Sequence, residues 1–181
     1  MQYKGRAIDS VLTELLEAMG AVLIEGPRGC GKTSTALAKA ASHVRLDKSP
    51  SMVQLAELNP SEIMKGDTPR LIDEWQLAPS IWNAVRHEID DRQQRGQFIL
   101  SGSSSPTMDE SRHSGAGRIA RLRMRPMALV ESGASSGSIS LNQLGMGESV
   151  SATSELSYKD LAEQAVRGGW PGLLEIGTRQ A

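Results

Sequence analysis

The fold is decided by Gly26-Pro27-Arg28-Gly29-Cys30-Gly31-Lys32-Thr33, which follows the apolar run Ala21-Val22-Leu23-Ile24. A glycine, four residues and then Gly-Lys-Thr is the pattern of a phosphate-binding loop, whose backbone N–H groups surround phosphate oxygens. Gly29 and Gly31 allow the backbone to curl tightly where a Cβ would clash. A helix beginning near Lys32 would point its positive end at the same phosphate. The stretch therefore predicts a buried strand, a phosphate-binding loop and a helix, in that order.

Composition narrows the class of protein. The chain has 181 residues, with 20 Lys and Arg against 21 Asp and Glu, and a formal net charge of −1. This balance gives no sign of a nucleic-acid-binding or membrane-surface protein, although it leaves local basic patches open. No apolar run approaches the ~20 residues needed to cross a bilayer. The single cysteine excludes an internal disulfide and is typical of a reducing cytoplasm. We expect a cytoplasmic protein with no membrane partner.

Hydrophobic periodicity predicts alternating strands and helices. We expect strands at 21–25, 44–47, 70–74, 97–101 and 119–126, and helices at 8–19, 32–42, 51–66, 79–94 and about 158–167. Pro60 is expected to interrupt the 51–66 helix or to start a new one. This alternation predicts an α/β fold, a three-layer α/β/α sandwich around a mostly parallel sheet.

The composition of the second half predicts the domain organisation. Residues 132–157 are rich in Ser and Gly and poor in apolar groups, which is typical of a flexible connector. We expect this connector to separate a core, residues 1–131, from a helical segment, residues 158–181, that begins a lid or a C-terminal region.

Two acids end the predicted strand 70–74 and indicate chemistry at the phosphate loop. Lys32 is expected to reach the β- and γ-phosphates, and the Thr33 hydroxyl to ligate Mg²⁺. Asp73 is the natural acid to hold the metal through a bound water. Glu74, the next residue, lies where a carboxylate polarises the water that attacks the γ-phosphate. A solvent-exposed pair of acids at the end of a strand is the alternative interpretation.

These motifs resemble those of AAA+-like P-loop ATPases, specifically the bacterial and archaeal ATP-binding proteins whose phosphate loop reads Gly-Pro-Arg-x-x-Gly-Lys-Thr. Leu71-Ile72-Asp73-Glu74 resembles the family's Walker B element, Phe98–Ser104 its sensor strand, Gly117-Arg118 its later Gly-Arg element and Gly168–Pro171 its Gly-Gly-aromatic-Pro turn. The resemblance implies ATP and Mg²⁺ as ligands. The nucleotide would contact Gly26, Pro27, Arg28, Gly29, Cys30, Gly31, Lys32, Thr33 and Ser34, and the metal Thr33 and Asp73. Relatives usually continue into a second domain, so we expect a chain ending at Ala181 to be a fragment.

The resemblance also implies two roles that depend on weaker motifs. Ser101 or Ser103 is expected to act as a sensor hydroxyl near the γ-phosphate, the alternative being a serine-rich turn without a ligand. Arg118 is expected to be an arginine finger that neutralises charge on a neighbouring subunit's γ-phosphate, with Arg121 as the substitute candidate. The alternative for Arg118 is an ordinary surface arginine. The expected partner is thus a second copy of this chain.

Two further patterns predict surface properties. Arg121, Arg123 and Arg125 share one face of the predicted strand 119–126, where they are expected to protect a sheet edge from aggregation, the alternative being that they bind nucleic acid or an acidic partner. Cys30 lies near Lys32 and a helix N-terminus, two features that activate a thiol. We therefore expect alkylation of Cys30 to block nucleotide binding and Mg-ATP to protect the thiol.

The sequence as a whole predicts an enzyme that hydrolyses ATP to ADP and phosphate with Mg²⁺, coupled to conformational change of an attached or partner domain. Two alternatives stay open: a nucleotide-dependent switch with little turnover, and a P-loop kinase that phosphorylates a small molecule. A kinase would require an Arg-rich lid and an acceptor pocket, and residues 132–157 do not resemble such a lid.

Overall fold

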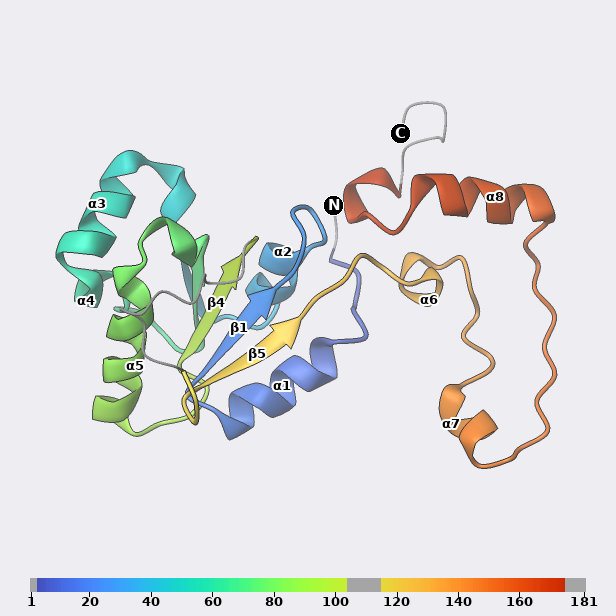
Figure 1. Ribbon diagram of the computed structural model, residues 1–181, viewed down its shortest axis with the longest axis horizontal. Helices are drawn as coiled ribbons and strands as arrows, with labels where there is room; N and C mark the ends of the chain where they lie inside the picture. The colour runs from blue at the N-terminus through green and yellow to red at the C-terminus, as the bar shows by residue number, and fades with distance from the viewer. Residues whose placement is uncertain (1–2, 104–114, 175–181) are drawn as a thin grey trace. The chain divides into compact units, whose positions relative to one another are not determined.

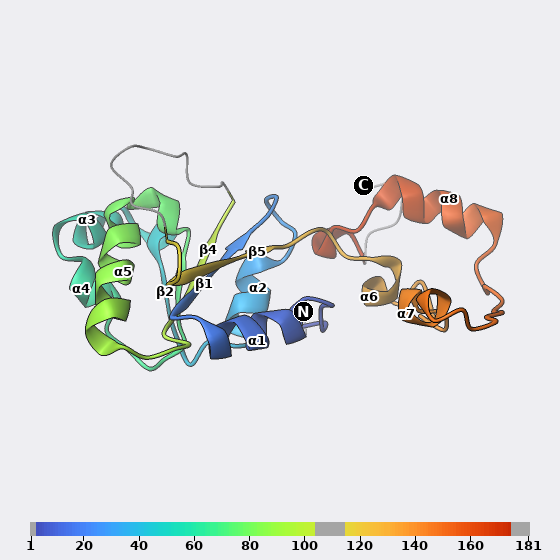
Figure 2. The ribbon, with the colours of Figure 1, turned by 60° about the horizontal axis from the view of Figure 1, so that its bottom comes forward.

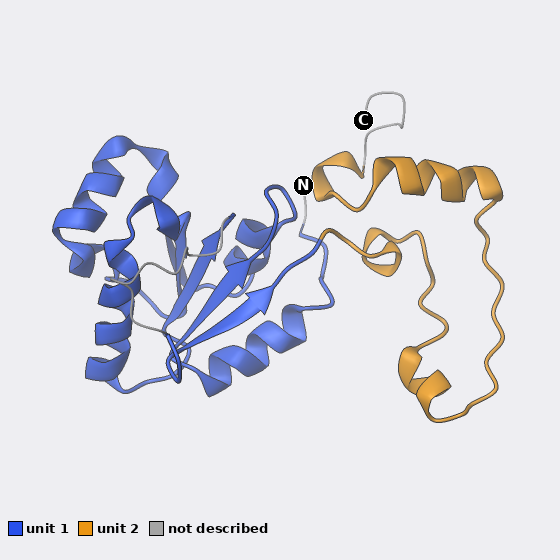
Figure 3. Ribbon diagram, viewed as in Figure 1, with its two compact units in different colours: residues 1–125 blue, residues 126–181 orange. Residues whose placement is uncertain are grey.

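The computed structural model describes residues 3–103 and 115–174 and divides the chain into two compact units, residues 1–125 and 126–181 (Figure 3). The first unit contains a five-stranded sheet (Figure 1). Its strands are β1 (Ala21–Glu25), β2 (Ser42–Arg45), β3 (Arg70–Asp73), β4 (Phe98–Gly102) and β5 (Ile119–Arg123). They lie in the order β2-β3-β4-β1-β5, and every described pair is parallel, as predicted. No helix among the described residues is long and apolar enough to cross a bilayer.

Helices cover both faces of this sheet, so the unit is the predicted three-layer sandwich. Figure 2 shows α1 (Asp9–Ala18) and α2 (Lys32–Leu37) on one side, with the other helices of the unit on the opposite side. These are α3 (Pro50–Leu58), α4 (Pro60–Ile63) and α5 (Ser80–Arg92). Short 3₁₀ turns, η1 (Leu46–Lys48) and η2 (Trp75–Leu77), follow β2 and β3. The carboxyl end of β1 leads through residues 26–31 into α2, and the carboxyl end of β3 leads through Glu74 into η2.

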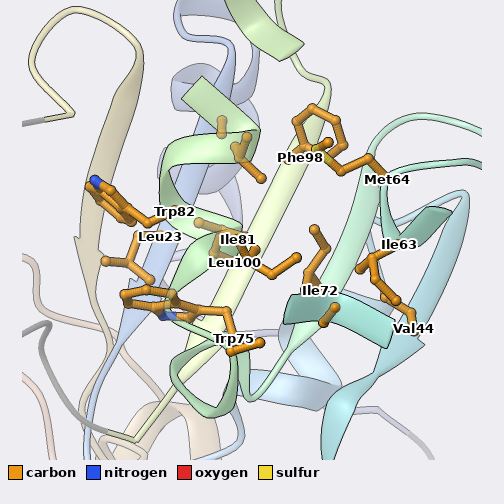
Figure 4. Packing of buried hydrophobic residues seen from close by; sticks show 14 of the residues in the cluster. Leu23, Val44, Ile63, Met64, Ile72, Trp75, Ile81, Trp82, Phe98 and Leu100 are labelled. Atoms are coloured by element: carbon orange, nitrogen blue, oxygen red, sulfur yellow. The ribbon is translucent and has the colours of Figure 1, made fainter. Parts of the chain in front are cut away.

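The core between the sheet and α5 holds the strands in place. Leu23, Ile72 and Leu100, from three neighbouring strands, lie in one cluster with Ile81 and Trp82 of α5 (Figure 4). Each of these side chains is at most 3% exposed. Burying one aliphatic side chain of this size contributes about 1.5–3 kcal/mol before entropy is counted. Because β1, β3 and β4 are packed so tightly, the residues at their carboxyl ends have fixed relative positions.

The register of the sheet brings the ends of four strands into one row. Asp73 of β3 lies opposite Arg45 of β2 on one side and opposite Ser101 of β4 on the other, and Ser101 lies opposite Ile24 of β1. In-register residues of parallel strands point to the same face of a sheet. Ligands of open α/β sheets bind at the carboxyl ends of the strands, which is where this row ends.

Several predicted elements differ in extent from those observed. β2 spans Ser42–Arg45 rather than 44–47, because Leu46 is fully buried in the η1 turn that follows. α2 ends at Leu37 rather than near residue 42, and β5 ends at Arg123 rather than at 126. The predicted helix 51–66 is two helices. Pro60 begins the second of them, as expected of a residue that lacks the N–H a helix interior needs.

The second unit consists of short helices: α6 (Leu129–Ser132), α7 (Leu141–Gly145), α8 (Tyr158–Arg167) and the 3₁₀ turn η3 (Pro171–Leu173). α8 coincides with the predicted helix at 158–167, and α7 lies within residues 132–157, where the sequence predicts a flexible connector. The N–H of Met127 donates to the carbonyl of Gly169 at 2.7 Å. A Cβ on Gly169 would lie 2.1 Å from the Met127 carbonyl oxygen, so this close approach requires glycine. Residues 175–181 of the predicted helical segment lie outside the described residues.

Candidate functional site

The phosphate loop connects β1 to α2 as the sequence predicts. Gly31 has a φ of 104° at the start of α2, a conformation that side chains rarely adopt. A Cβ on Gly26 would lie 2.3 Å from the carbonyl oxygen of Met124, so the loop begins against the backbone that follows β5. Both glycines are therefore required by the path of the chain.

Lys32 occupies the interior of the loop. Its ammonium donates to the carbonyl oxygens of Gly26 and Pro27 at 2.7 and 2.9 Å, and the residue is only 7% exposed. Carbonyl oxygens are neutral acceptors, whereas an anionic phosphate adds a full charge–charge attraction to the hydrogen bond from an ammonium. The site thus holds a positive charge on acceptors that a phosphate group can replace.

Asp73 is the centre of the hydrogen bonds at the strand ends. The Thr33 hydroxyl lies 3.1 Å from both carboxylate oxygens of Asp73, and the buried Ser101 hydroxyl donates to Oδ1. On the other side, Nε of Arg45 lies 3.7 Å from Oδ2. Asp73 is 2% exposed, and a buried carboxylate is stable only with such partners. The structure therefore brings together the two predicted metal-binding residues, Thr33 and Asp73.

The donor set fits a magnesium ion held jointly with a nucleotide. Mg²⁺ prefers oxygen ligands, retains water and is usually held by one or two carboxylates together with substrate phosphates. The Thr33 hydroxyl and the Asp73 carboxylate are such donors. In the described ranges 3–103 and 115–174, no group of three or more His, Cys, Asp or Glu side chains is placed to hold a metal ion. Phosphate oxygens and water would complete the coordination shell of a magnesium ion held by these two residues.

Glu74 has an unusual backbone conformation. Its φ and ψ are 55° and 40°, in the left-handed region, where a residue with a side chain loses about 1–2 kcal/mol. This conformation turns the chain from β3 into η2, where Trp75 is fully buried. The side-chain amide of Gln76 donates to Oε2 of Glu74 and orients the carboxylate. Residues held in such conformations cluster at functional sites. Glu74 is therefore not a freely solvated acid at the end of a strand. The hydrogen bond from Gln76 to Glu74 was not predictable, because Gln76 belongs to no sequence motif.

An open cavity of about 570 Å³ adjoins the start of the loop and is lined by Glu25, Gly26, Pro27, Ser103 and Arg123. The two candidate sensor residues thus have different positions: Ser101 is bonded to Asp73, whereas Ser103 faces the cavity. Arg123 lies opposite Glu25 in the sheet register. The sequence places Arg123 in the arginine stripe of the predicted strand 119–126 but does not predict its position at this cavity. The signal for this position is that Arg123 is the last residue of β5 and lies beside Glu25, the last residue of β1.

Cys30 corrects one prediction. Its side chain is fully buried, so the thiol is not accessible to a reagent in solution. The expectation of ready alkylation is therefore wrong, and labelling should be slow with or without nucleotide, because a reagent would have to open the core. Arg28 and Ser34, by contrast, are exposed on the loop and on the first turn of α2.

Arg118 lies at the opposite end of the sheet from the loop. Its carbonyl accepts from the N–H of Ala21 at the start of β1, and its Nε lies 2.6 Å from Oδ1 of Asp90. The hydrogen bond from Arg118 lowers the pKa of Asp90 below its ordinary value. β1 is five residues long, roughly 16 Å, so Arg118 does not reach the loop of its own chain. Its predicted role on a neighbouring subunit stays a prediction. Arg121, the substitute candidate, lies with Nη1 3.5 Å from Oε1 of Glu25.

Residues 19–132 match the profile of a family described as an AAA domain. No curated protein sequence matches the chain. Among solved structures, PCH-2 of C. elegans is similar, with 16% sequence identity and a TM-score of 0.36 over 70% of this chain and 42% of that chain. The chain thus spans less than half the length of that protein.

Proposed function

The chain belongs to the AAA domain family, and from this premise we propose that it binds ATP with Mg²⁺ at the phosphate loop and hydrolyses it to ADP and phosphate. One observation carries the proposal. The buried carboxylate of Asp73 is hydrogen-bonded by Thr33, the residue that follows the loop lysine, and by Ser101 on the adjoining strand. Two hydroxyls and a carboxylate thus meet at the carboxyl ends of parallel strands, and the adjoining loop holds the ammonium of Lys32 on its own carbonyls.

Each of these side chains has a distinct role in the proposal. Lys32 leaves the loop carbonyls and neutralises the β- and γ-phosphates, while the loop N–H groups hold the phosphate chain. Thr33 and Asp73 hold the magnesium ion, which supplies charge neutralisation when it is bound. Glu74 accepts a hydrogen bond from the attacking water and removes its proton as the new P–O bond forms and the bond from the γ-phosphorus to the bridging oxygen breaks, with ADP as the leaving group. Hydrolysis would be coupled to conformational change of the second unit or of a partner.

The proposal is tested by measuring ATP affinity and ATP turnover in the same variants. Lys32→Ala is expected to lose ATP binding. Glu74→Gln is expected to keep it and to lose turnover by about 100-fold or more, the usual contribution of a general base. Lys39→Ala is the matched control, because Lys39 is exposed just beyond α2. Unchanged ATP affinity in Lys32→Ala, or normal turnover in Glu74→Gln, would contradict the assignment.

A second candidate function is a nucleotide-dependent switch with little turnover. The observation that favours it is the position of Arg118, which is paired with Asp90 at the far end of the sheet and supplies no charge to its own site. A single chain would then lack one cation that stabilises the transition state. Negligible turnover at every protein concentration, together with tight ATP binding, would favour the switch over the enzyme.

A further inference from the structure

Arg6 is a buried guanidinium that binds the phosphate loop from behind. The residue is only 9% exposed, although it precedes the first helix of the chain. Its Nη1 donates to the carbonyl of Cys30 at 2.8 Å, and its Nη2 donates to the carbonyl of Arg125 at 2.8 Å. One side chain therefore joins the N-terminal segment, the loop and the chain that leaves β5.

This contact fixes the orientation of one peptide unit in the loop. The carbonyl of Cys30 and the N–H of Gly31 belong to the same planar trans peptide, so they point in opposite directions. When Arg6 holds the carbonyl on the buried side, the N–H of Gly31 is directed to the other side of the loop. That N–H belongs to the group of donors on which a phosphate-binding loop depends.

The chemistry of arginine suits this position. A guanidinium presents several N–H donors in a rigid planar fork, and it stays charged under all ordinary conditions. Two carbonyl oxygens on separate segments match two arms of the fork. A lysine in its place offers a single charged nitrogen on a flexible stem, so it cannot hold both carbonyls with the same geometry.

Neighbouring contacts fix Arg6 itself. Its backbone N–H donates to Oδ2 of Asp9 at 2.8 Å, and the hydroxyl of Tyr3 donates to Oδ1 of the same carboxylate at 2.7 Å. The Tyr3 hydroxyl also lies 3.1 Å from Oγ1 of Thr35 on α2. Next to Arg125, whose carbonyl Arg6 also binds, the N–H of Met124 donates to the carbonyl of Glu25, the residue directly before the loop. Both attachments of Arg6 are thus made to backbone that is held in place by other bonds.

We propose that Arg6 is a positioning residue of the nucleotide site, which sets the direction of the Gly31 N–H and thereby the affinity of the loop for phosphate. The proposal rests on the proposed function, since it assumes that the loop binds a nucleotide. ATP and ADP share the phosphates that a loop of this kind surrounds. Loss of Arg6 therefore weakens the binding of both nucleotides by a similar factor.

The test compares wild type, Arg6→Ala, Arg6→Lys and Arg95→Ala by calorimetric titration with Mg-ATP and Mg-ADP. Arg6→Ala is expected to weaken both nucleotides by about tenfold or more, and Arg6→Lys by a smaller factor. Arg95→Ala is the matched control, because exposed Arg95 also donates to a backbone carbonyl, that of Glu17, far from the loop. It is expected to keep the wild-type Kd.

A second measurement separates positioning from simple loss of stability and does not use nucleotide. The amide resonance of Gly31 in the ligand-free protein is expected to shift in both Arg6 variants and to stay in place in Arg95→Ala, at a temperature where circular dichroism shows every variant folded. A folded Arg6→Lys or Arg6→Ala protein with the wild-type Gly31 resonance and wild-type Kd values overturns the proposal. Failure of wild type to bind either nucleotide overturns the proposed function, and the role in nucleotide affinity with it.

Discussion

The two ends of the sheet carry similar features in different settings. Each end has an aspartate bonded to polar or charged side chains, and each has a residue other than glycine in the left-handed conformation. At the carboxyl end these are Asp73 and Glu74, and at the amino end they are Asp90 and Gln93. Asp73 is 2% exposed, whereas the side chain of Asp90 is 44% exposed.

The difference shows which features indicate a site. Asp90 has a guanidinium partner in solvent, where an ion pair contributes little to stability. Gln93 closes the C-terminus of α5, where its N–H donates to the carbonyl of Ile89, and this is an ordinary place for a left-handed residue. Asp73 and Glu74, by contrast, lie at the strand ends that adjoin the phosphate loop. Both ends have a charged group and a strained residue. What distinguishes the carboxyl end is that its aspartate is buried and that side chains from several elements bond to it.

The largest expected effect comes from the left-handed residues. Asparagine tolerates this conformation better than Glu or Gln, so Glu74→Asn and Gln93→Asn should both relieve backbone strain. We expect Gln93→Asn to raise the free energy of unfolding by about 0.5 kcal/mol, and Glu74→Asn by less, because its hydrogen bond with Gln76 is lost. ATP turnover should fall by about 100-fold or more only in Glu74→Asn. Denaturant unfolding and a phosphate-release assay measure the two quantities.

The contrast between the two ends of the sheet is wrong if both substitutions leave turnover at the wild-type rate. The left-handed conformation of Glu74 would then serve only the turn from β3 into η2 and not the reaction. The contrast is also wrong if Gln93→Asn reduces turnover as much as Glu74→Asn. A gain in stability together with a loss of turnover at Glu74 alone would show that this strain serves the chemistry.

A smaller effect is expected from the two aspartates. Asp73→Asn keeps the shape of the side chain and one oxygen acceptor for Thr33 or Ser101, but it removes the charge that faces the metal. A residue that orients a metal through water typically changes metal affinity by about 10–100-fold. The Mg²⁺ concentration that half-saturates ATP binding should rise by that factor in Asp73→Asn and stay unchanged in Asp90→Asn. Equal Mg²⁺ dependence in the two variants would remove Asp73 from the metal site.

The sequence predicts the parts of this site that depend on local pattern. The glycine spacing of Gly26–Thr33 and the apolar run before Asp73 are sufficient to place a loop and an acid at the ends of parallel strands. The contacts of Ser101 and Arg45 with Asp73 are not predictable in this way, because they depend on the order of the strands. β4 is the neighbour of β3 in the sheet, and this pairing places Ser101 beside Asp73.

Contacts between distant segments and burial are also beyond local pattern. Arg6 precedes Cys30 by 24 residues and Arg125 by 119, so its fork of hydrogen bonds exists only in the folded chain. The sequence likewise places Cys30 beside a lysine but does not show that its side chain turns into the core. A local pattern identifies which residues are near the chemistry, and tertiary packing decides which side chains face it.

The smallest expected effect concerns Arg118 at the amino end. Because Arg118 donates to Asp90, the folded pKa of that carboxyl lies below its unfolded value. The pair therefore favours the folded state above the unfolded pKa, and this contribution disappears as the pH falls through the folded pKa. In Arg118→Ala, an NMR titration should show the pKa of Asp90 moving back toward its ordinary value, with no measurable change in ATP affinity, since the loop is at the other end of β1. Turnover that rises with protein concentration in wild type but not in Arg118→Ala would assign the arginine to a neighbouring subunit's site. Turnover that is equal in both proteins and independent of protein concentration would show that Arg118 only forms a surface ion pair with Asp90. The residues at the carboxyl end of the sheet would then be sufficient for hydrolysis.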